Sequence, residues 1–232
     1  MIRPGAALDA LGVAHNCDKS SAGRVKDGVR LPAHDFLRKY AMFLERFRHQ
    51  PDLRLMELGI GPDWNMGASL RVWEGYFPQP GARFTMVDNN PAARRFDGGR
   101  VSVRVGDLGE AAFLAGLAKE PQDVILDDAS HQWAHQIGAF RALFGALRPG
   151  GVYIVEDIHT SFGPGRRRFG AEGRQDAFDF LTRLTALVAG KGAAHPLLEG
   201  VPERAALEAL AREVESVTVI AEACILCKAG YY

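Results

Sequence analysis

The sequence predicts one α/β domain built on a mostly parallel sheet with helices on both faces. Seven short apolar runs alternate with segments of helical period from residue 51 onward, which is typical of strands joined by crossover helices. Hydrophobic residues make up 47% of the 232 residues, enough to bury a sizeable core. The last two runs are separated by only Ala221 and Glu222, so we expect them to pair as an antiparallel hairpin.

The first 50 residues are expected to form an N-terminal helical or capping segment, ahead of an α/β domain over 51–232. Glycine and polar clusters predict irregular or capping structure over about the first 30 residues. Apolar residues then recur with a nearly helical period over 34–47, which predicts a helix there.

Each later element has its own signal. Short runs rich in Leu, Val and Ile predict the strands, and longer amphipathic segments predict the helices. The strands are expected at 53–58, 84–88, 101–105, 124–127, 152–155, 217–220 and 223–227, and the helices at 69–76, 109–119, 133–147, 176–188 and 204–212.

The composition argues against several classes of protein. Lys plus Arg and Asp plus Glu each number 28, whereas a nucleic-acid-binding domain usually carries excess positive charge. No apolar run approaches the roughly 20 residues needed to cross a bilayer, and the sequence starts without a signal-peptide pattern. Three cysteines do not suit a disulfide framework. We therefore expect a cytoplasmic protein that binds neither nucleic acid nor membrane, alone or as a homo-oligomer.

Carboxylates stand at or just after the ends of the first five predicted strands. Parallel strands end at one edge of a sheet about 4.8 Å apart, so acids at adjacent strand ends come within reach of one another. At the fourth and fifth ends these acids are Asp128, Glu156 and Asp157. Their charge can be compensated by a hard divalent cation such as Mg²⁺ or Mn²⁺, or the acids can cap helices or pair with arginines.

A nucleotide-type site is indicated at the first two strand ends. Asp88 ends the second strand, where nucleotide-binding sheets hold ribose hydroxyls, and Glu57 lies near the end of the first. Gly59 and Gly61 would let the backbone approach a ligand closely. Because their spacing is not G-x-G-x-x-G, a dinucleotide is disfavoured and an adenosine-type cofactor without phosphates is favoured.

Histidines flank the predicted acid cluster. His131 follows Asp128 by three residues, where a neutral imidazole could take a proton from a substrate hydroxyl or could bond only to local backbone. His135, His159 and Trp133 are secondary candidates for substrate contact. The glycine-bearing segment around Arg166-Arg-Arg168 is expected to form a mobile cover above the site.

Several motifs resemble a known family. Glu57-Leu-Gly-Ile-Gly61 and Gly67-Ala-Ser-Leu-Arg-Val-Trp73 are similar to the first motif of class I S-adenosylmethionine-dependent methyltransferases. Asp127-Asp-Ala-Ser-His131 and Gly150-Gly-Val-Tyr-Ile-Val-Glu-Asp157 resemble later motifs of the metal-dependent macrolide-sugar O-methyltransferases, the mycinamicin and demethylmacrocin type. One departure is Ala129, where that family usually has glycine.

The resemblance implies a Rossmann-like, seven-stranded fold that uses S-adenosylmethionine and Mg²⁺ or Mn²⁺. It implies metal ligands at Asp128, Glu156 and Asp157 and a general base at His131. The residues expected near the cofactor are Glu57, Gly59, Gly61, Ser69, Asp88, Asn89, Asp107, Leu108 and Asp127.

The implied activity is methyl transfer to a hydroxyl of a small molecule, a sugar or a glycosylated natural product. Two alternatives stay open. A catechol or phenol O-methyltransferase could use the same metal and strand ends, and a methyltransferase-like module could bind a cofactor or partner without catalysis. The sequence does not show the lining of the acceptor pocket, so it does not separate these readings.

Overall fold

A computed structural model of the protein describes residues 4–170, 175–201 and 203–230. The chain forms two compact units, Met1–Val105 and Gly106–Tyr232, which are described in turn. The main sheet has seven strands, three from the first unit and four from the second. This confirms the predicted class, a mostly parallel α/β sheet that ends in an antiparallel hairpin.

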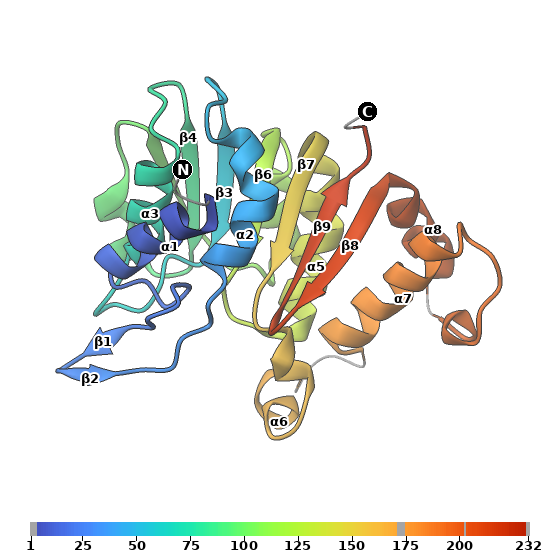
Figure 1. The fold of residues 1–232 in the computed structure, drawn as a ribbon. Coiled ribbons are helices and arrows are strands. Elements are labelled where there is room, and N and C mark those ends of the chain that lie inside the picture. The colour runs from blue at the N-terminus through green and yellow to red at the C-terminus, as the bar shows by residue number, and fades with distance from the viewer. Residues whose placement is uncertain (1–3, 171–174, 202, 231–232) are drawn as a thin grey trace. The chain divides into compact units, whose positions relative to one another are not determined.

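The first unit contains three parallel strands in the order β5-β4-β3, of which β3 and β4 are labelled in Figure 1. These are β3 (Arg54–Leu58), β4 (Arg83–Asp88) and β5 (Val101–Val105). Glu57 of β3 pairs with Met86 of β4, so the carboxyl ends of the two strands lie side by side. Helix α3 (Ala68–Tyr76) follows β3, and the 3-10 helix η2 (Pro91–Phe96) follows β4.

The N-terminal segment is more regular than the sequence predicts. Helix α1 (Pro4–Ala14) packs against both α2 (Leu37–Leu44) and α3, and the 3-10 helix η1 (Glu45–Phe47) extends α2. Strands β1 (Val25–Lys26) and β2 (Val29–Arg30) form a separate hairpin. The sequence predicts irregular or capping structure over about the first 30 residues, within a helical or capping segment, and does not mark α1 as a separate helix because its alanines and glycines give only a weak apolar stripe. The helix predicted over 34–47 is confirmed in α2 and η1.

The second unit contains four strands in the order β6-β7-β9-β8. These are β6 (Gln122–Asp127), β7 (Leu147–Val155), β8 (Val214–Ile220) and β9 (Ala223–Lys228). Strands β6 and β7 are parallel, whereas β9 is antiparallel to both of its neighbours. The predicted C-terminal hairpin is therefore confirmed.

Strand β7 starts five residues before its predicted start at residue 152, at Leu147. Helix α5 (Trp133–Leu143) and the 3-10 helix η3 (Phe144–Ala146) accordingly end before the predicted limit of 147. Pro149 cannot donate to a ladder, and the register between β6 and β7 shifts between Gln122 and Val124. The irregular pairing accommodates the proline inside the strand, which the Pro-Gly-Gly signal did not reveal.

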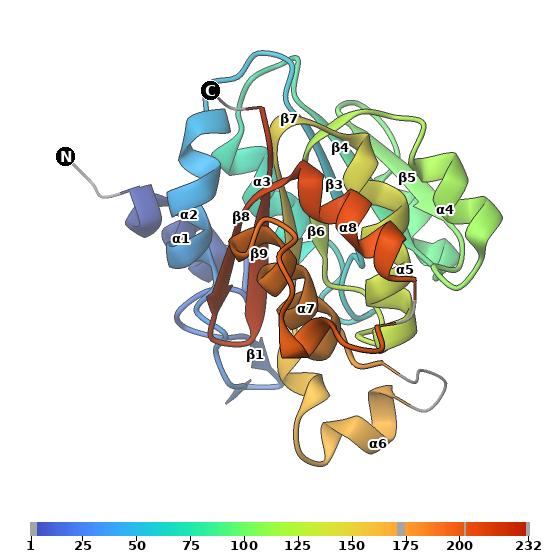
Figure 2. The same ribbon diagram turned by 90° about the vertical axis from the view of Figure 1, so that its right-hand side faces the viewer.

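The helices of the second unit are α4 (Ala111–Leu117), α5, α6 (Gly165–Phe169), α7 (Ala177–Ala189) and α8 (Arg204–Glu213), with the 3-10 helices η4 (Ile158–Ser161) and η5 (Pro196–Leu198). Helices α7 and α8 lie side by side (Figure 2). The ring of Phe140 on α5 lies 5.1 Å from Tyr153 of β7 and 5.8 Å from Phe180 of α7, so aromatic packing joins these helices to the sheet. No helix within the described residues is long and apolar enough to span a membrane.

Candidate active site

The end of β3 carries a buried carboxylate. Glu57 is 0% exposed, and its Oε2 accepts hydrogen bonds from Ser69 Oγ at 2.7 Å and Trp73 Nε1 at 2.9 Å. Its Oε1 lies 3.8 Å from Nζ of the equally buried Lys19. Two residues predicted to contact the cofactor, Glu57 and Ser69, are thus joined to each other. In the structure, the contacts of Glu57 connect helix α3 and the segment around Lys19 to the end of β3.

The loop after β3 is shaped by glycines and by the acid at the end of β4. Gly59 and Gly61 both have φ of 90°, a conformation that side-chain-bearing residues rarely adopt. Asp88 Oδ2 accepts a hydrogen bond from the backbone N–H of Ile60 at 3.0 Å, and its Oδ1 accepts one from Asn90 at 2.8 Å. Asn89 is exposed beside it. The predicted ribose-binding acid therefore lies against the glycine loop, with an exposed amide next to it.

At the start of the second unit, Asp107 is exposed and Leu108 is buried. Asp107 Oδ1 accepts a hydrogen bond from the backbone N–H of Gly109 at 2.8 Å. A Cβ atom at Gly109 would lie 3.1 Å from Nε2 of His135, and Nδ1 of that histidine is 2.9 Å from Ser130 Oγ. His135 is therefore held against this turn, beside a residue predicted to bind the cofactor.

A cluster of two carboxylates and one imidazole forms beyond the ends of β6 and β7. Asp128, His131 and Asp157 each offer one ligand atom, and these atoms all lie within 4.8 Å of one another. His131 Nε2 is 3.2 Å from Asp157 Oδ2, and Nδ1 of the exposed His159 is 3.6 Å from Asp157 Oδ1. The structure thus brings together the predicted base and two of the three predicted metal ligands.

The backbone conformation explains how Asp157 reaches the cluster. Asp157 has φ 57° and His131 has φ 56°, both in the left-handed region that non-glycine residues seldom occupy. The carbonyl of Asp157 accepts hydrogen bonds from the backbone N–H of Thr160 at 3.0 Å and from its hydroxyl at 2.9 Å. These bonds curl the chain into η4 immediately after β7 and hold the unusual conformation in place.

Glu156, the third predicted metal ligand, lies outside this group of three. It is 2% exposed, its backbone N–H donates to the carbonyl of Asp127 at 2.9 Å, and its own carbonyl accepts from Gln136 Nε2 at 2.8 Å. Carboxylate oxygens are the donors that Mg²⁺ and Mn²⁺ prefer, so Asp128 and Asp157 fit such an ion. The ligand role of Glu156 stays a prediction.

Asp127, at the end of β6, is buried and lies next to the cluster in sequence. Burial and the nearby charge of Asp128 raise the pKa of Asp127 to about 7, although a hydrogen bond from the N–H of Ala129 opposes the shift. The hydroxyl of Tyr153 is buried as well, and burial together with the charge of Asp127 raises its pKa. Asp127 therefore faces an apolar interior that disfavours its charge.

Trp133 is covered and does not line an open surface. Its side chain is 4% exposed, the guanidinium of Arg166 lies 5.1 Å from the centre of its ring, and a Cβ atom at Gly170 would lie 2.2 Å from it. The segment expected to be a mobile cover contains helix α6, packed on Trp133, and its role as a cover stays a prediction. The substrate role of Trp133 stays a prediction as well.

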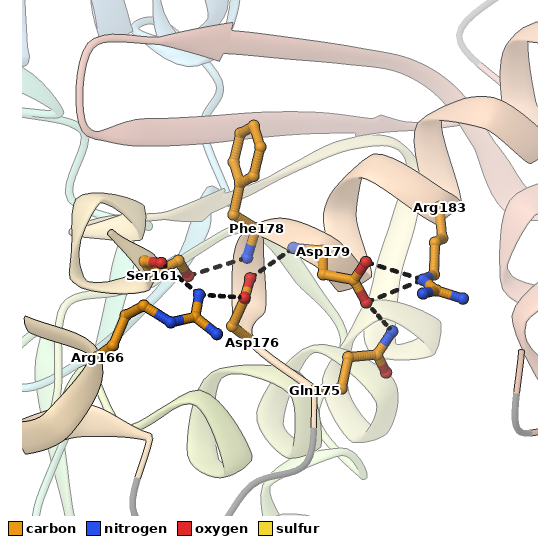
Figure 3. A network of polar contacts seen from close by, with 7 residues as sticks. All are labelled: Ser161, Arg166, Gln175, Asp176, Phe178, Asp179 and Arg183. Carbon is orange, nitrogen blue, oxygen red and sulfur yellow. Dashed lines mark hydrogen bonds and ion pairs between the residues drawn. The ribbon is translucent and has the colours of Figure 1, made fainter. Parts of the chain in front are cut away.

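Sequence reasoning missed the polar network that anchors α6 (Figure 3). Nη1 of Arg166 donates to the carbonyl of Ser161 and to Oδ2 of Asp176, both at 2.8 Å. Asp176 also caps α7, because its Oδ1 accepts the backbone N–H of Asp179 at 2.7 Å. Arginine and aspartate ten residues apart carry no recognisable local signal, so only the folded chain shows this pair.

The seven-stranded sheet with its C-terminal antiparallel hairpin has the fold of a solved methyltransferase structure. A solved structure of the MycE methyltransferase from the mycinamycin biosynthetic pathway, in complex with Mg, SAH and mycinamycin VI, matches with a TM-score of 0.74 at 25% identity. The match covers 96% of this chain and 54% of that one. A second crystal form of MycE with Mg and SAH gives a TM-score of 0.75.

Among curated proteins, the chain is similar to macrolide and tetracenomycin sugar O-methyltransferases. It is 43% identical over 138 residues to the 8-demethyl-8-(2-methoxy-alpha-L-rhamnosyl)-tetracenomycin-C 3'-O-methyltransferase of Streptomyces olivaceus, covering 57% of this chain and 34% of that protein. It is 35% identical over 139 residues to the mycinamicin VI 2''-O-methyltransferase of Micromonospora griseorubida, covering 57% and 33%. The chain thus aligns with about a third of the length of these relatives, and no protein-family model matches it.

Proposed function

We propose that this protein transfers a methyl group from S-adenosylmethionine to a hydroxyl of a small molecule, a sugar or a glycosylated natural product, with assistance from a divalent metal. The observation that carries the proposal is the cluster of His131, Asp128 and Asp157. An imidazole 3.2 Å from a carboxylate can take up a proton, and two acidic oxygen donors can hold a hard cation. The named relatives modify sugar hydroxyls.

The methyl donor is expected at the glycine loop and the acids around it. Gly59 and Gly61 allow close approach of the backbone, and Asp88 presents a carboxylate beside that loop for ribose hydroxyls. The further residues expected to contact the donor are Glu57, Ser69, Asn89, Asp107, Leu108 and Asp127. S-Adenosylmethionine supplies an activated methyl group, so the chain has to orient the acceptor and remove its proton.

The residues that would hold the metal are Asp128 and Asp157, with Glu156 as the third. A bound Mg²⁺ or Mn²⁺ supplies Lewis acidity, which lowers the pKa of an acceptor hydroxyl. His131 accepts the hydroxyl proton at Nε2, the nitrogen that faces the carboxylates. Asp157 Oδ2, 3.2 Å away, stabilises the positive imidazolium that results.

The same proposal covers the organisation of the chain. Residues 51–232 are assigned to the methyltransferase domain and residues 1–50 to an N-terminal helical and capping segment. We expect the protein to act in the cytoplasm, as a monomer or homo-oligomer, on a free small molecule and without nucleic acid or membrane.

The test compares two acceptors with and without metal. Methyl transfer from S-adenosylmethionine is measured by mass spectrometry on 4-nitrophenyl α-L-rhamnoside and on 3,4-dihydroxybenzoate, in EDTA and after addition of excess Mg²⁺. The proposal expects product from the rhamnoside only when Mg²⁺ is present. Product from the catechol alone would favour a phenol methyltransferase. Binding of S-adenosylhomocysteine by calorimetry, without turnover of either compound, would favour a non-catalytic module.

A further inference from the structure

Helix α6 carries an aromatic side chain onto the imidazole of the candidate site. The rings of Phe169 and His131 are 6.0 Å apart between centroids and inclined by 67°, the edge-to-face arrangement that aromatic pairs favour. Phe169 is the last residue of α6, and its own side chain is half-buried. The contact therefore places a rigid apolar surface against one side of the histidine.

Contacts of Arg166 connect helix α6 to the segments on either side of it. Arg166 donates hydrogen bonds to the carbonyl of Ser161 and to Asp176 (Figure 3). Its guanidinium also lies over the ring of Trp133, 5.1 Å from the ring centre. Asp176 at the same time caps the thirteen-residue helix α7. A helix of five residues gains little stability from its own hydrogen bonds, so these outside contacts determine its position.

The chain also passes too close to Trp133 for a side chain at the end of α6. A Cβ atom at Gly170 would lie 2.2 Å from the indole ring, so the main chain there packs directly on the aromatic surface. At the other end, a Cβ atom at Gly165 would lie 3.0 Å from the carbonyl of Thr160. The chain at both ends of α6 therefore packs closely against its neighbours, Trp133 at one end and Thr160 at the other.

His131 needs such support because the usual one is missing. A catalytic or metal-facing histidine commonly has its ring fixed by a hydrogen bond from its second nitrogen to a carbonyl or carboxylate. Nδ1 of His131 is buried and has no hydrogen-bond partner among the described residues. Nε2 lies 3.2 Å from Asp157 Oδ2, which restrains the ring on one side only, and a contact on the ring face adds a second restraint on its rotation.

We propose that Phe169 is a positioning residue for His131, and that Arg166 holds it there through Asp176 and Trp133. The ring of Phe169 replaces the missing hydrogen bond and keeps Nε2 directed toward the carboxylates. This inference rests on the proposed function for its effect on catalysis, whereas the ring contact can be measured without turnover.

The variants are Phe169→Leu, which keeps apolar volume and loses the ring, and Phe169→Tyr, which keeps the ring. Phe162→Leu is the matched control, because Phe162 is 54% exposed and its ring packs on Phe178, 4.9 Å away. Phe169→Leu is expected to lower kcat on the rhamnoside about tenfold, with KM and the affinity for S-adenosylhomocysteine changed less than about twofold. Phe169→Tyr and Phe162→Leu should keep kcat within about twofold of the parent protein.

The second measurement is ¹H–¹³C NMR of the full chain labelled on its seven histidines, with the His131 ring signal assigned by its loss in His131→Gln. The ring current of Phe169 should displace that signal in the parent protein and in Phe169→Tyr, and Phe169→Leu should move it. An unmoved signal in Phe169→Leu overturns the inference. A moved signal with unchanged kcat overturns it too. A parent protein inactive on both acceptors defeats the proposed function instead, and an unmoved His131 signal in Phe169→Leu would still overturn the ring contact on its own.

Discussion

Nε2 of His131 lies 3.2 Å from Oδ2 of Asp157, and both residues adopt the left-handed backbone conformation. Each such conformation costs of order 1 kcal/mol for a non-glycine residue, so the surrounding structure has to impose it. His131 and Asp157 lie in turns at the ends of two neighbouring strands, and their side chains meet although both backbones carry this energetic cost. The surrounding fold, and not the local sequence, therefore determines the contact.

His131→Gln is expected to lower kcat on the rhamnoside by at least about 100-fold, because the variant keeps a polar side chain but cannot take up a proton. Affinity for S-adenosylhomocysteine, measured by calorimetry, should stay unchanged. His159→Gln is the control, since His159 is exposed and lies 3.6 Å from the same aspartate. Equal losses in both variants would contradict the assignment of His131 as the base.

Asp157→Asn is expected to weaken Mn²⁺ binding at least about tenfold, because a neutral amide offers a poorer donor to a hard cation than a carboxylate does. Electron paramagnetic resonance of free Mn²⁺ gives the affinity directly, without any turnover. Glu156→Gln decides whether the buried neighbour takes part. Loss of affinity in that variant would show that Glu156 joins Asp128 and Asp157, and unchanged affinity would confine the site to the two aspartates.

The raised pKa of Asp127 predicts a pH-dependent stability. In the folded protein the pKa is about 7, compared with an ordinary value of 3.8, so the unfolded chain ionises first as pH rises. The unfolded state then binds fewer protons than the folded state, and stability falls between about pH 4 and pH 7. In Asp127→Asn the decrease in the free energy of unfolding over that pH range should be smaller by about 1 to 4 kcal/mol.

Urea denaturation in EDTA at pH 4.5 and pH 7.5 measures the effect. Asp123→Asn is the control, because Asp123 is also buried but is paired with Arg148 at 3.1 Å. Asp123→Asn should be less stable than the parent protein at both pH values, but its free energy of unfolding should still fall with rising pH as Asp127 dictates. A slope unchanged in Asp127→Asn would show that this carboxyl ionises as easily as one in water.

Lys19→Met should destabilise the protein by about 3 kcal/mol, because it removes the positive charge 3.8 Å from the buried carboxylate of Glu57. Lys19→Met combined with Glu57→Gln should recover part of the loss, since the double variant leaves no buried charge at either position. Thermal unfolding followed by circular dichroism compares the three proteins. A double variant that is less stable than Lys19→Met would mean that the hydrogen bonds from Ser69 and Trp73, and not Lys19, stabilise the carboxylate of Glu57.

Much of the fold could be predicted because its signals are local. All seven main strands follow short apolar runs, and the acids at the ends of β4 and β6 mark the edge of the sheet. Helix α1 was not predicted because Ala and Gly give a weak periodic pattern. Helix α6 was not predicted because its position depends on the contact between Arg166 and Asp176. Local sequence cannot indicate contacts of that kind.

The candidate site was predictable in composition but not in detail. The acids and His131 could be assigned to strand ends, and two of the three acids do meet the histidine. The separation of Glu156 from Asp157 could not be foreseen, because the chain changes direction between them. Glu156 continues the buried strand, whereas Asp157 has φ 57° and starts the turn into η4.

One carboxylate, Asp176, both begins α7 and holds Arg166. Fraying of the first turn of α7 would therefore release the arginine that fastens α6. On heating, the loss of catalytic competence should then precede the main unfolding transition, because a local opening costs less free energy than disruption of the β-sheet. Strengthening that one helix start should raise the temperature at which α6 comes loose, without altering any residue of the candidate site.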